Sequence, residues 1–191
     1  MIEKLVALDQ KVFVYLNGLG SEQYDALWSF ITKQINWIPV FLLIFYIIFK
    51  KLGWRHTLMV VLVVSVLIAL TDQTTNLIKY SVQRLRPCNE PAIKDYIRIV
   101  ISRQSFSFVS GHASNSMAAA ILLYLIMKPY VRYMGLIFLW PLIFAYSRIY
   151  LGLHYPLDIL CGFALGTLTA FIVYQLYKYL RKKYFPESLF N

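Results

Sequence analysis

Apolar residues gather in five segments of the chain, at residues 35–49, 58–78, 114–127, 135–150 and 157–179. Each segment is a helix candidate, although several contain fewer than the ~20 purely apolar residues that a bilayer-spanning helix needs. Polar residues make up the shortfall at one end only, as where Thr71, Asp72 and Gln73 follow the mostly apolar residues 58–70. An intramembrane Asp is costly unless it faces a polar interior. The pattern predicts an all-α, polytopic transmembrane helical bundle of about five spans, with the polar helix ends together.

The first 33 residues mix apolar and charged positions. We expect amphipathic helices here that lie on or dip into the outer membrane interface, and a sixth full span is the alternative. Glu3, Lys4 and Asp9 interrupt the first apolar stretch, which argues against a cleavable signal peptide. Because no repeat or low-complexity segment divides the chain, we expect one domain over residues 1–191, with interfacial helices in residues 1–33 and the chemistry in residues 79–158.

Basic residues between the apolar segments predict the orientation in the membrane. All of them fall at one end of the predicted bundle, which the positive-inside rule assigns to the cytoplasm. The other face then carries the N-terminus, the long connection over residues 80–110 and the turn around His154. The basic residues are Lys50, Lys51, Arg55, Lys128, Arg132, Lys178, Arg181, Lys182 and Lys183.

Composition agrees with a membrane location and adds a preference for anions. The 191 residues are 59% hydrophobic, well above the share in a soluble domain. The net charge of +10 favours an anionic lipid surface or an anionic substrate, and the membrane composition makes nucleic acid the poorest candidate partner. The two cysteines, Cys88 and Cys161, exclude a disulfide framework, and we expect both to be free.

The outer ends of the helices carry most of the candidate chemistry. Three cations, two imidazoles and one carboxylate would be expensive near a bilayer unless a multiply charged anion neutralised them, and a phosphate group meets that requirement. The sequence places them in three short stretches, which are Lys79 with Arg86-Pro87, Ser110-Gly111-His112, and Ser147-Arg148 with His154 and Asp158.

Local rules suggest how these residues meet. Ser110 can cap the third apolar helix, whose free backbone amides then point at an anion. Pro156 suits a first helical position, so Asp158 can reach back to one nitrogen of His154 and leave the other nitrogen free to attack. Lys79 and Arg86 are seven residues apart and would share one helix face if the helix continued to Pro87.

These stretches resemble the three motifs of the type 2 phosphatidic acid phosphatase (PAP2) family. That signature reads Lys, six residues, Arg-Pro; then Pro-Ser-Gly-His; then Ser-Arg, five residues, His, three residues, Asp. The chain reads KYSVQRLRP, VSGH and SRIYLGLHYPLD in the same order and spacing. Val109 stands where the family usually has Pro, a change that bears on the geometry of the turn and removes no chemical group.

The resemblance implies a membrane-bound, metal-independent lipid phosphatase that needs no cofactor. Lys79, Arg86 and Arg148 would bind the phosphoryl oxygens, and Ser110 with the Gly111 amide would complete the cradle. His154 would attack phosphorus to form a phosphohistidine, and Asp158 would orient it. His112 would protonate the leaving oxygen and then serve as base for hydrolysis. We expect the active site to face the periplasm from a bacterial inner membrane.

The motifs recognise phosphate and leave the lipid open. A periplasm-facing site favours undecaprenyl pyrophosphate or lipid A, with phosphatidylglycerophosphate and phosphatidic acid as alternatives. A lipid-phosphate transporter would not need the His154–Asp158 pair, and transfer to an acceptor lipid is a variant of the same chemistry. Vanadate-dependent haloperoxidases hold vanadate with similar cations, but they are soluble. The motifs do not indicate the oligomeric state.

Several residues also have structural interpretations. His112, His154 and Asp158 could ligate a metal, but three cations would crowd it and no carboxylate cluster offsets them. We expect His56 to be structural, and Asp72 to pair with Lys79 or to make a packing hydrogen bond. Four outer-loop residues form either a solvated basic surface or contacts with a phosphorylated headgroup; they are Arg84, Lys94, Arg98 and Arg103.

Overall fold

The computed structural model describes residues 2–185, so the extreme ends of the domain expected over residues 1–191 lie outside it. Within this range the chain is helical and contains no strand. Its α-helices are α1 (Ile2–Gly18), α2 (Asp25–Ile31), α3 (Ile38–Val82), α4 (Gly111–Met127), α5 (Leu139–Tyr150) and α6 (Pro156–Tyr184). Short 3₁₀ turns lie at Glu22–Tyr24, Gln34–Trp37, Pro87–Asn89, Lys94–Tyr96 and Met134–Phe138.

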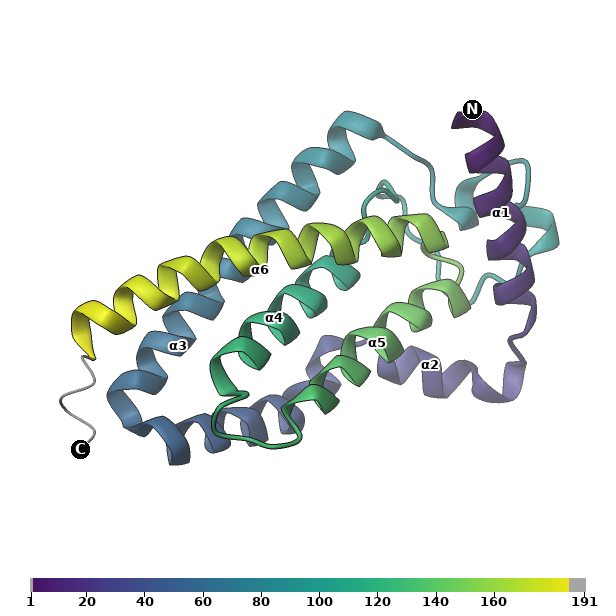
Figure 1. The fold of residues 1–191 in the computed structure, drawn as a ribbon. Helices are drawn as coiled ribbons and strands as arrows, with labels where there is room; N and C mark the ends of the chain where they lie inside the picture. Colours follow the sequence, from purple (N-terminus) through teal and green to yellow (C-terminus); the bar gives the residue numbers. More distant parts are fainter. Residues whose placement is uncertain (1, 186–191) are drawn as a thin grey trace.

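Helix α3 consists of two arms that meet at Gly53. The backbone there has φ 74° and ψ 169°, a conformation that residues with a side chain rarely adopt. The chain turns back at this point, so the arms form a V (Figure 1). The arms correspond to the first two predicted spans, whose ends differ from the structure by a few residues.

Helix α4 lies at the centre and packs against α3, α5 and α6 (Figure 1). Its contact with α6 is close because α6 presents Gly166, where a Cβ atom would collide with the Ser114 carbonyl oxygen. Small residues at such crossings allow two backbones to approach in a membrane bundle. The predicted third, fourth and fifth spans therefore correspond to α4, to the 3₁₀ turn with α5, and to α6.

The outer surface of the bundle is apolar, as expected for contact with lipid. Leu42, Leu62, Leu160 and Ile172 are each more than half exposed. By length and composition, two helical segments in the described chain can cross a membrane, Gln34–Asn89 and Pro156–Tyr184, and two shorter apolar helices, Gly111–Met127 and Met134–Tyr150, lie beside them. The first of these segments contains both arms of α3.

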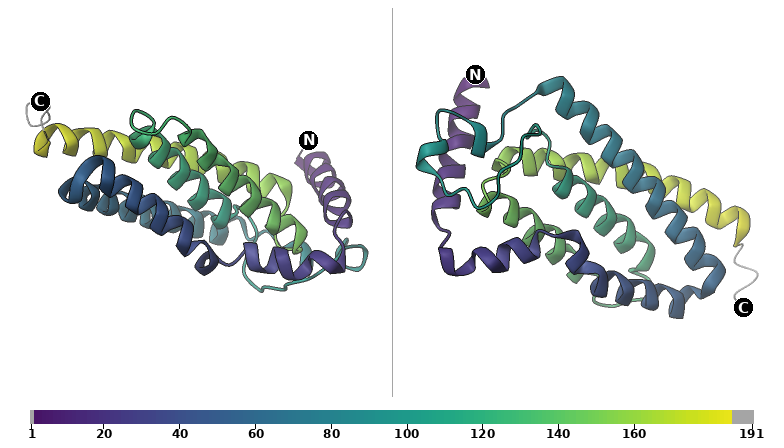
Figure 2. Two further views of the ribbon diagram at one scale, coloured as in Figure 1. Left: turned by 90° about the horizontal axis from the view of Figure 1, so that it is seen from below. Right: turned by 180° about the vertical axis from the view of Figure 1, so that it is seen from behind.

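Helix α1 lies across one end of the bundle, and the last turns of α6 lie at the opposite end (Figure 2). Phe13 of α1 is fully buried against the edge of the Tyr155 ring. Asn17 is also fully buried, and its side-chain amide donates to the carbonyl oxygens of Ile149 and Tyr150. The N-terminal helix thus packs on the same end of α5 and α6 that carries the sequence motifs.

Candidate functional site

A polar cavity of about 200 Å³ lies at the end of the bundle near α1. Its wall comes from the end of α3, the loop after it, the start of α4, the end of α5 and the loop before α6. Six of the eight predicted site residues line it, namely Lys79, Arg86, Gly111, His112, Arg148 and His154. The other two, Ser110 and Asp158, are fully buried behind this wall.

Lys79 and Arg86 reach the cavity by a route that differs from the expected one. The helix ends at Val82, and Gln83 follows in the left-handed conformation with φ 52°. Arg86 therefore lies on extended backbone, with φ −73° and ψ 154°, and the prediction of a shared helix face was wrong. A left-handed residue after the last helical turn is a common helix end.

Buried hydrogen bonds hold the two arginines of the motifs. Arg86 is 3% exposed and donates through Nε to the Ser105 carbonyl oxygen at 2.7 Å and through Nη1 to the Leu153 carbonyl oxygen at 2.9 Å. Arg148 is 2% exposed and donates through Nη1 to Oγ1 of Thr32 at 2.6 Å. Guanidinium groups fixed in this way present donors in a rigid geometry that suits phosphate.

The start of α4 has the predicted cap. Ser110 is the N-cap residue, and its Oγ accepts the Ala113 N–H at 3.4 Å. Its backbone N–H donates to the Asp158 carbonyl oxygen at 3.0 Å, which joins the first turns of α4 and α6. Gly111, the first helical residue, lines the cavity. The cap therefore forms although Val109 occupies the position where Pro is usual.

His154 lies in the loop before α6 and is 1% exposed. Its Nε2 is 3.0 Å from Nη1 of Arg86, and its Nδ1 is 3.4 Å from Oδ2 of Asp158. Asp158 belongs to the first turn of α6, where the same oxygen accepts the Tyr155 N–H at 3.0 Å. The arrangement predicted from Pro156 and the four-residue spacing is thus present, with Nε2 on the cavity side.

Ser107 is a member of this group that the sequence analysis missed. Its Oγ lies 3.3 Å from Nδ1 of His154 and donates a short hydrogen bond to Oδ2 of Asp158. Ser105 and Thr32, the partners of the two arginines, were missed as well. Single serines and threonines in loops carry no distinguishing local signal, so only the folded arrangement identifies them.

Electrostatics keep the His154 ring neutral. Burial, together with the positive charges of Arg86, Arg148 and Lys79, holds the pKa of His154 well below the ordinary value of a histidine. A neutral ring at neutral pH has a lone pair on one nitrogen, and the carboxylate behind Nδ1 favours a proton on that side.

The outer-loop cations divide into three groups. Arg84 forms ion pairs with Asp9 and Asp158, and Arg98 forms one with Asp25. Neither arginine therefore belongs to a solvated basic surface. Arg103 lines the polar cavity. Lys94 is exposed.

Asp72 and His56 make structural contacts. Asp72 accepts hydrogen bonds from the side-chain amides of Asn76 at 3.3 Å and Asn115 at 3.5 Å, which fits the expected packing role. His56 is buried at the far end of the bundle, where its Nε2 lies 2.9 Å from the Tyr177 hydroxyl.

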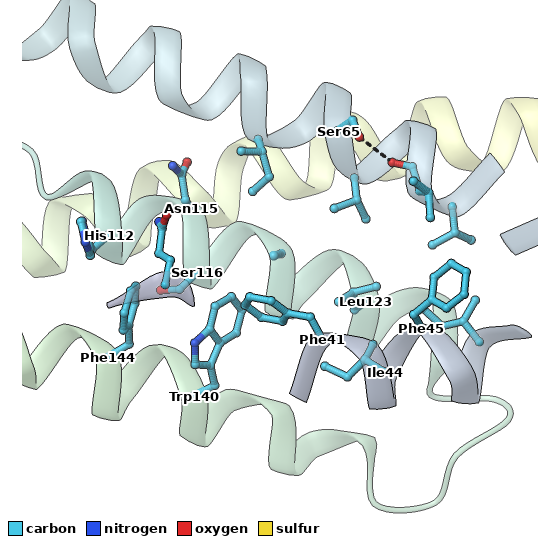
Figure 3. Close-up of a pocket in the computed structure, with 17 residues that line it drawn as sticks. Phe41, Ile44, Phe45, Ser65, His112, Asn115, Ser116, Leu123, Trp140 and Phe144 are labelled. Atoms are coloured by element: carbon cyan, nitrogen blue, oxygen red, sulfur yellow. Dashed lines mark hydrogen bonds between the residues drawn. The ribbon is translucent and has the colours of Figure 1, made fainter. Parts of the chain in front are cut away.

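A second cavity, of about 390 Å³ and largely apolar, begins beside the polar one (Figure 3). It runs between the two arms of α3, α4 and α5. Figure 3 shows His112 and Asn115 at one end and Phe41, Trp140 and Phe45 along its length. Because His112 and Asn115 line both cavities, the polar cavity and the apolar cavity are adjacent.

Comparison with known proteins identifies the family. A family model described as the PAP2 superfamily matches residues 57–182. The lipid A 4'-phosphatase of Bacteroides thetaiotaomicron is 35% identical over 179 residues, which cover 91% of this chain and 79% of that protein. The undecaprenyl-diphosphatase of Sulfolobus acidocaldarius is 29% identical over 185 residues, which cover 91% of this chain and 81% of that protein.

Solved structures have the same fold. The transmembrane PAP2-type phosphatidylglycerolphosphate phosphatase of Bacillus subtilis gives a TM-score of 0.71 at 18% identity, covering 96% of this chain and 89% of that one. Aquifex aeolicus LpxE gives a TM-score of 0.66 at 19% identity, and the match covers 86% of this chain and 93% of LpxE. The chain therefore belongs to the PAP2 superfamily and is a membrane lipid phosphatase.

Proposed function

We propose that the chain removes phosphate from a lipid headgroup by nucleophilic attack of His154, without a metal ion. The observation that carries this proposal is the position of His154 at the wall of the polar cavity. Its Nε2 is beside Arg86, its Nδ1 is backed by Asp158, and Arg148 and Lys79 line the same cavity. This is the arrangement of a nucleophile, an orienting carboxylate and an anion site.

In the first step the phosphoryl group occupies the polar cavity. Lys79, Arg86 and Arg148 bind its oxygens, and the Gly111 amide at the start of α4, the helix that Ser110 caps, completes the cradle. Nε2 of His154 attacks phosphorus, a P–N bond forms, and the P–O bond to the lipid breaks. His112 donates a proton to the departing lipid oxygen. The cations stabilise the charge that develops on the transferring group.

In the second step water hydrolyses the phosphohistidine. His112, now neutral, accepts a proton from the attacking water, the P–N bond breaks, and inorganic phosphate leaves with one oxygen from water. The neutral His154 ring is restored. Asp158 stabilises the positive charge that the ring carries while it is phosphorylated.

The charge of the cavity supports chemistry without a metal ion. Four of the five charged residues that line the cavity are cations, and Asp72 is the fifth, so the net positive charge neutralises an anion and would repel a divalent cation. His112, His154 and Asp158 are then used as acid, nucleophile and orienting group, and none of them remains free to act as a ligand.

We further propose five membrane spans, formed by the two arms of α3 and by α4, α5 and α6 within a single domain. The basic clusters at the Gly53 end would face the cytoplasm, so the polar cavity would open to the periplasmic side of a bacterial inner membrane. A lipid headgroup in the outer leaflet could then enter the cavity from the membrane plane.

The cell-envelope lipids are our first choice of substrate. Lipid A and undecaprenyl diphosphate both present a phosphate group at the outer leaflet, and the relatives of 35% and 29% identity are described as phosphatases of these two lipids. Phosphate release from each lipid in mixed micelles, measured side by side, would rank them. A higher kcat/KM for a phosphatidylglycerophosphate than for either would reject this choice.

The apolar cavity is suited to an acyl or prenyl chain of the substrate. Ser65 is exposed at its wall and donates to the Val61 carbonyl oxygen at 3.0 Å. Ser65→Trp should therefore fill part of the cavity and raise KM for a long-chain lipid phosphate about 10-fold, while a water-soluble short-chain phosphate is hydrolysed as before.

Val66 offers a matched control, because it is adjacent, 42% exposed and absent from the cavity wall. Val66→Trp should leave KM for both substrates unchanged. Equal KM values for Ser65→Trp and the unmodified protein on the long-chain lipid would show that the chain does not occupy this cavity.

A further inference from the structure

Asp9 of α1 makes two partly buried contacts with the catalytic region. Its Oδ2 accepts from Nη2 of Arg84 at 2.7 Å, and its Oδ1 accepts the backbone N–H of Leu157 at 2.9 Å. The Asp9 side chain is only 5% exposed. One carboxylate thus ties the N-terminal helix both to the loop after α3 and to the first turn of α6.

Arg84 carries this connection to Asp158. Its Nη1 donates to Oδ1 of Asp158 at 2.8 Å, while its Nη2 is held by Asp9. The guanidinium group also lies over the Tyr155 ring, with 3.9 Å from Cζ to the ring centroid. Two carboxylates and an aromatic face therefore fix the Arg84 side chain in one position.

The two oxygens of Asp158 have different partners. Oδ2 is on the side of His154 and Ser107, and Oδ1 is on the side of Arg84. Because Asp158 is fully buried, its charge needs a partner, and the contact at Oδ1 also stops the carboxylate from rotating. Together with the Tyr155 N–H and the Ser107 hydroxyl, which both donate to Oδ2, this contact keeps Oδ2 toward Nδ1 of His154.

The charge of Asp9 has a separate effect. Arg84 alone would offset much of the negative charge that Asp158 offers to the phosphorylated His154 ring. Asp9, which contacts the other nitrogen of the same guanidinium group, offsets part of the positive charge of Arg84. Asp158 then keeps more of its effect on His154.

We propose that Asp9 and Arg84 are positioning residues of the active site, and that the chain Asp9–Arg84–Asp158 makes helix α1 a part of the catalytic unit. This inference rests on the proposed function, in which His154 is the nucleophile. Neither residue touches the phosphate; both act on His154 through Asp158. These contacts are the same whichever lipid is the substrate.

Asp9→Asn keeps the size of the side chain and removes its charge. We expect kcat to fall roughly 10-fold, the order of effect seen when a residue that orients a catalytic group is lost. KM and competitive inhibition by inorganic phosphate should stay unchanged, because Lys79, Arg86 and Arg148 are untouched. Loss of a residue that is needed only for folding would not lower kcat while leaving KM and phosphate inhibition unchanged.

Arg84 supplies the second variant and a test of coupling. Arg84→Gln should lower kcat at least as much as Asp9→Asn, and Arg84→Lys should restore part of the loss because it keeps the charge. The double variant Asp9→Asn with Arg84→Gln should be no slower than Arg84→Gln alone, since both changes break one chain of contacts.

Asp25→Asn is the matched control. Asp25 is the first residue of α2, and it pairs with Nη2 of Arg98 at 2.9 and 3.0 Å, outside the polar cavity. We expect this variant to keep the kcat of the unmodified protein. Elution and thermal midpoint in detergent should match between the Asp9 and Asp25 variants.

Three results would overturn the inference while the unmodified protein is active. The first is a normal kcat for Asp9→Asn. The second is a rise in KM and in the phosphate inhibition constant of Asp9→Asn that is as large as the fall in its kcat. The third is a loss of kcat in the double variant that equals the two single losses combined. If Asp9→Asn does not fold, equal activity of Arg84→Gln and Arg84→Lys would overturn it. An unmodified protein that releases no phosphate from any lipid would instead reject the proposed function.

Discussion

Arg148→Ala is expected to reduce phosphate release by at least about 10²-fold, while the protein stays folded in detergent. Arg148 is 2% exposed, is anchored through Nη1 to Thr32, and lines the cavity that we assign to phosphate. Its charge would act where negative charge develops on the transferring group, and loss of one such donor commonly costs 10²–10³-fold in rate. Arg86→Ala should have an effect of the same size.

The comparison is made by steady-state phosphate release at saturating lipid, after size-exclusion chromatography of each variant. Arg132→Ala serves as the control, because Arg132 is exposed at the opposite end of the bundle and its removal should change nothing. Full activity in Arg148→Ala or in Arg86→Ala would remove that arginine from the phosphate site.

A phosphohistidine should be trapped in the unmodified protein and be absent from His154→Asn. Nε2 of His154 is on the cavity side, and its Nδ1 faces Ser107 and Asp158. Attack on the lipid phosphate therefore leaves the phosphoryl group on this nitrogen. Rapid quenching with labelled substrate should yield a phosphoprotein that is labile in acid and stable in base, the behaviour expected of a P–N bond.

His56→Gln provides the control for this experiment, because His56 lies at the far end of the bundle and Gln can still bond the Tyr177 hydroxyl. That variant should form the same amount of phosphoprotein as the unmodified protein. Label that persists in His154→Asn, or that maps to another residue, would exclude His154 as the nucleophile.

Local features of the site could be predicted from the sequence because they depend on neighbouring residues. Ser110 caps α4, Pro156 begins α6, and Asp158 reaches back to the side of His154, as short-range helix rules require. The apolar segments likewise predicted where the helices lie, since each segment is longer than any strand would need to be.

Contacts between distant parts of the chain could not be predicted in this way. Ser107 meets Asp158 across 51 positions, and Thr32 meets Arg148 across 116. The prediction that Lys79 and Arg86 share a helix face was wrong for a related reason. Nothing in the local pattern shows that Gln83 adopts a left-handed conformation and ends the helix. The ion pairs of Arg84 likewise join distant parts of the chain, with Asp9 75 positions before it and Asp158 74 positions after it.

The N-terminal helix is the clearest example of this limit. Its mixed pattern predicted an amphipathic helix at the membrane interface, and its exposed side chains include the apolar Leu5 and Leu8. The same pattern does not show that Asp9 is directed inward to Arg84 and to the start of α6. A charged residue on an amphipathic helix is usually solvated, so the sequence alone favours the wrong environment for this carboxylate.

The most direct test of the account is phosphate release from a panel of lipid phosphates by detergent-purified protein, in excess chelator, with His154→Ala measured alongside. We predict that release persists in the chelator and disappears in the variant, as expected for histidine chemistry without a metal ion. Loss of activity in the chelator that added metal restores, or equal release by His154→Ala, would contradict the account.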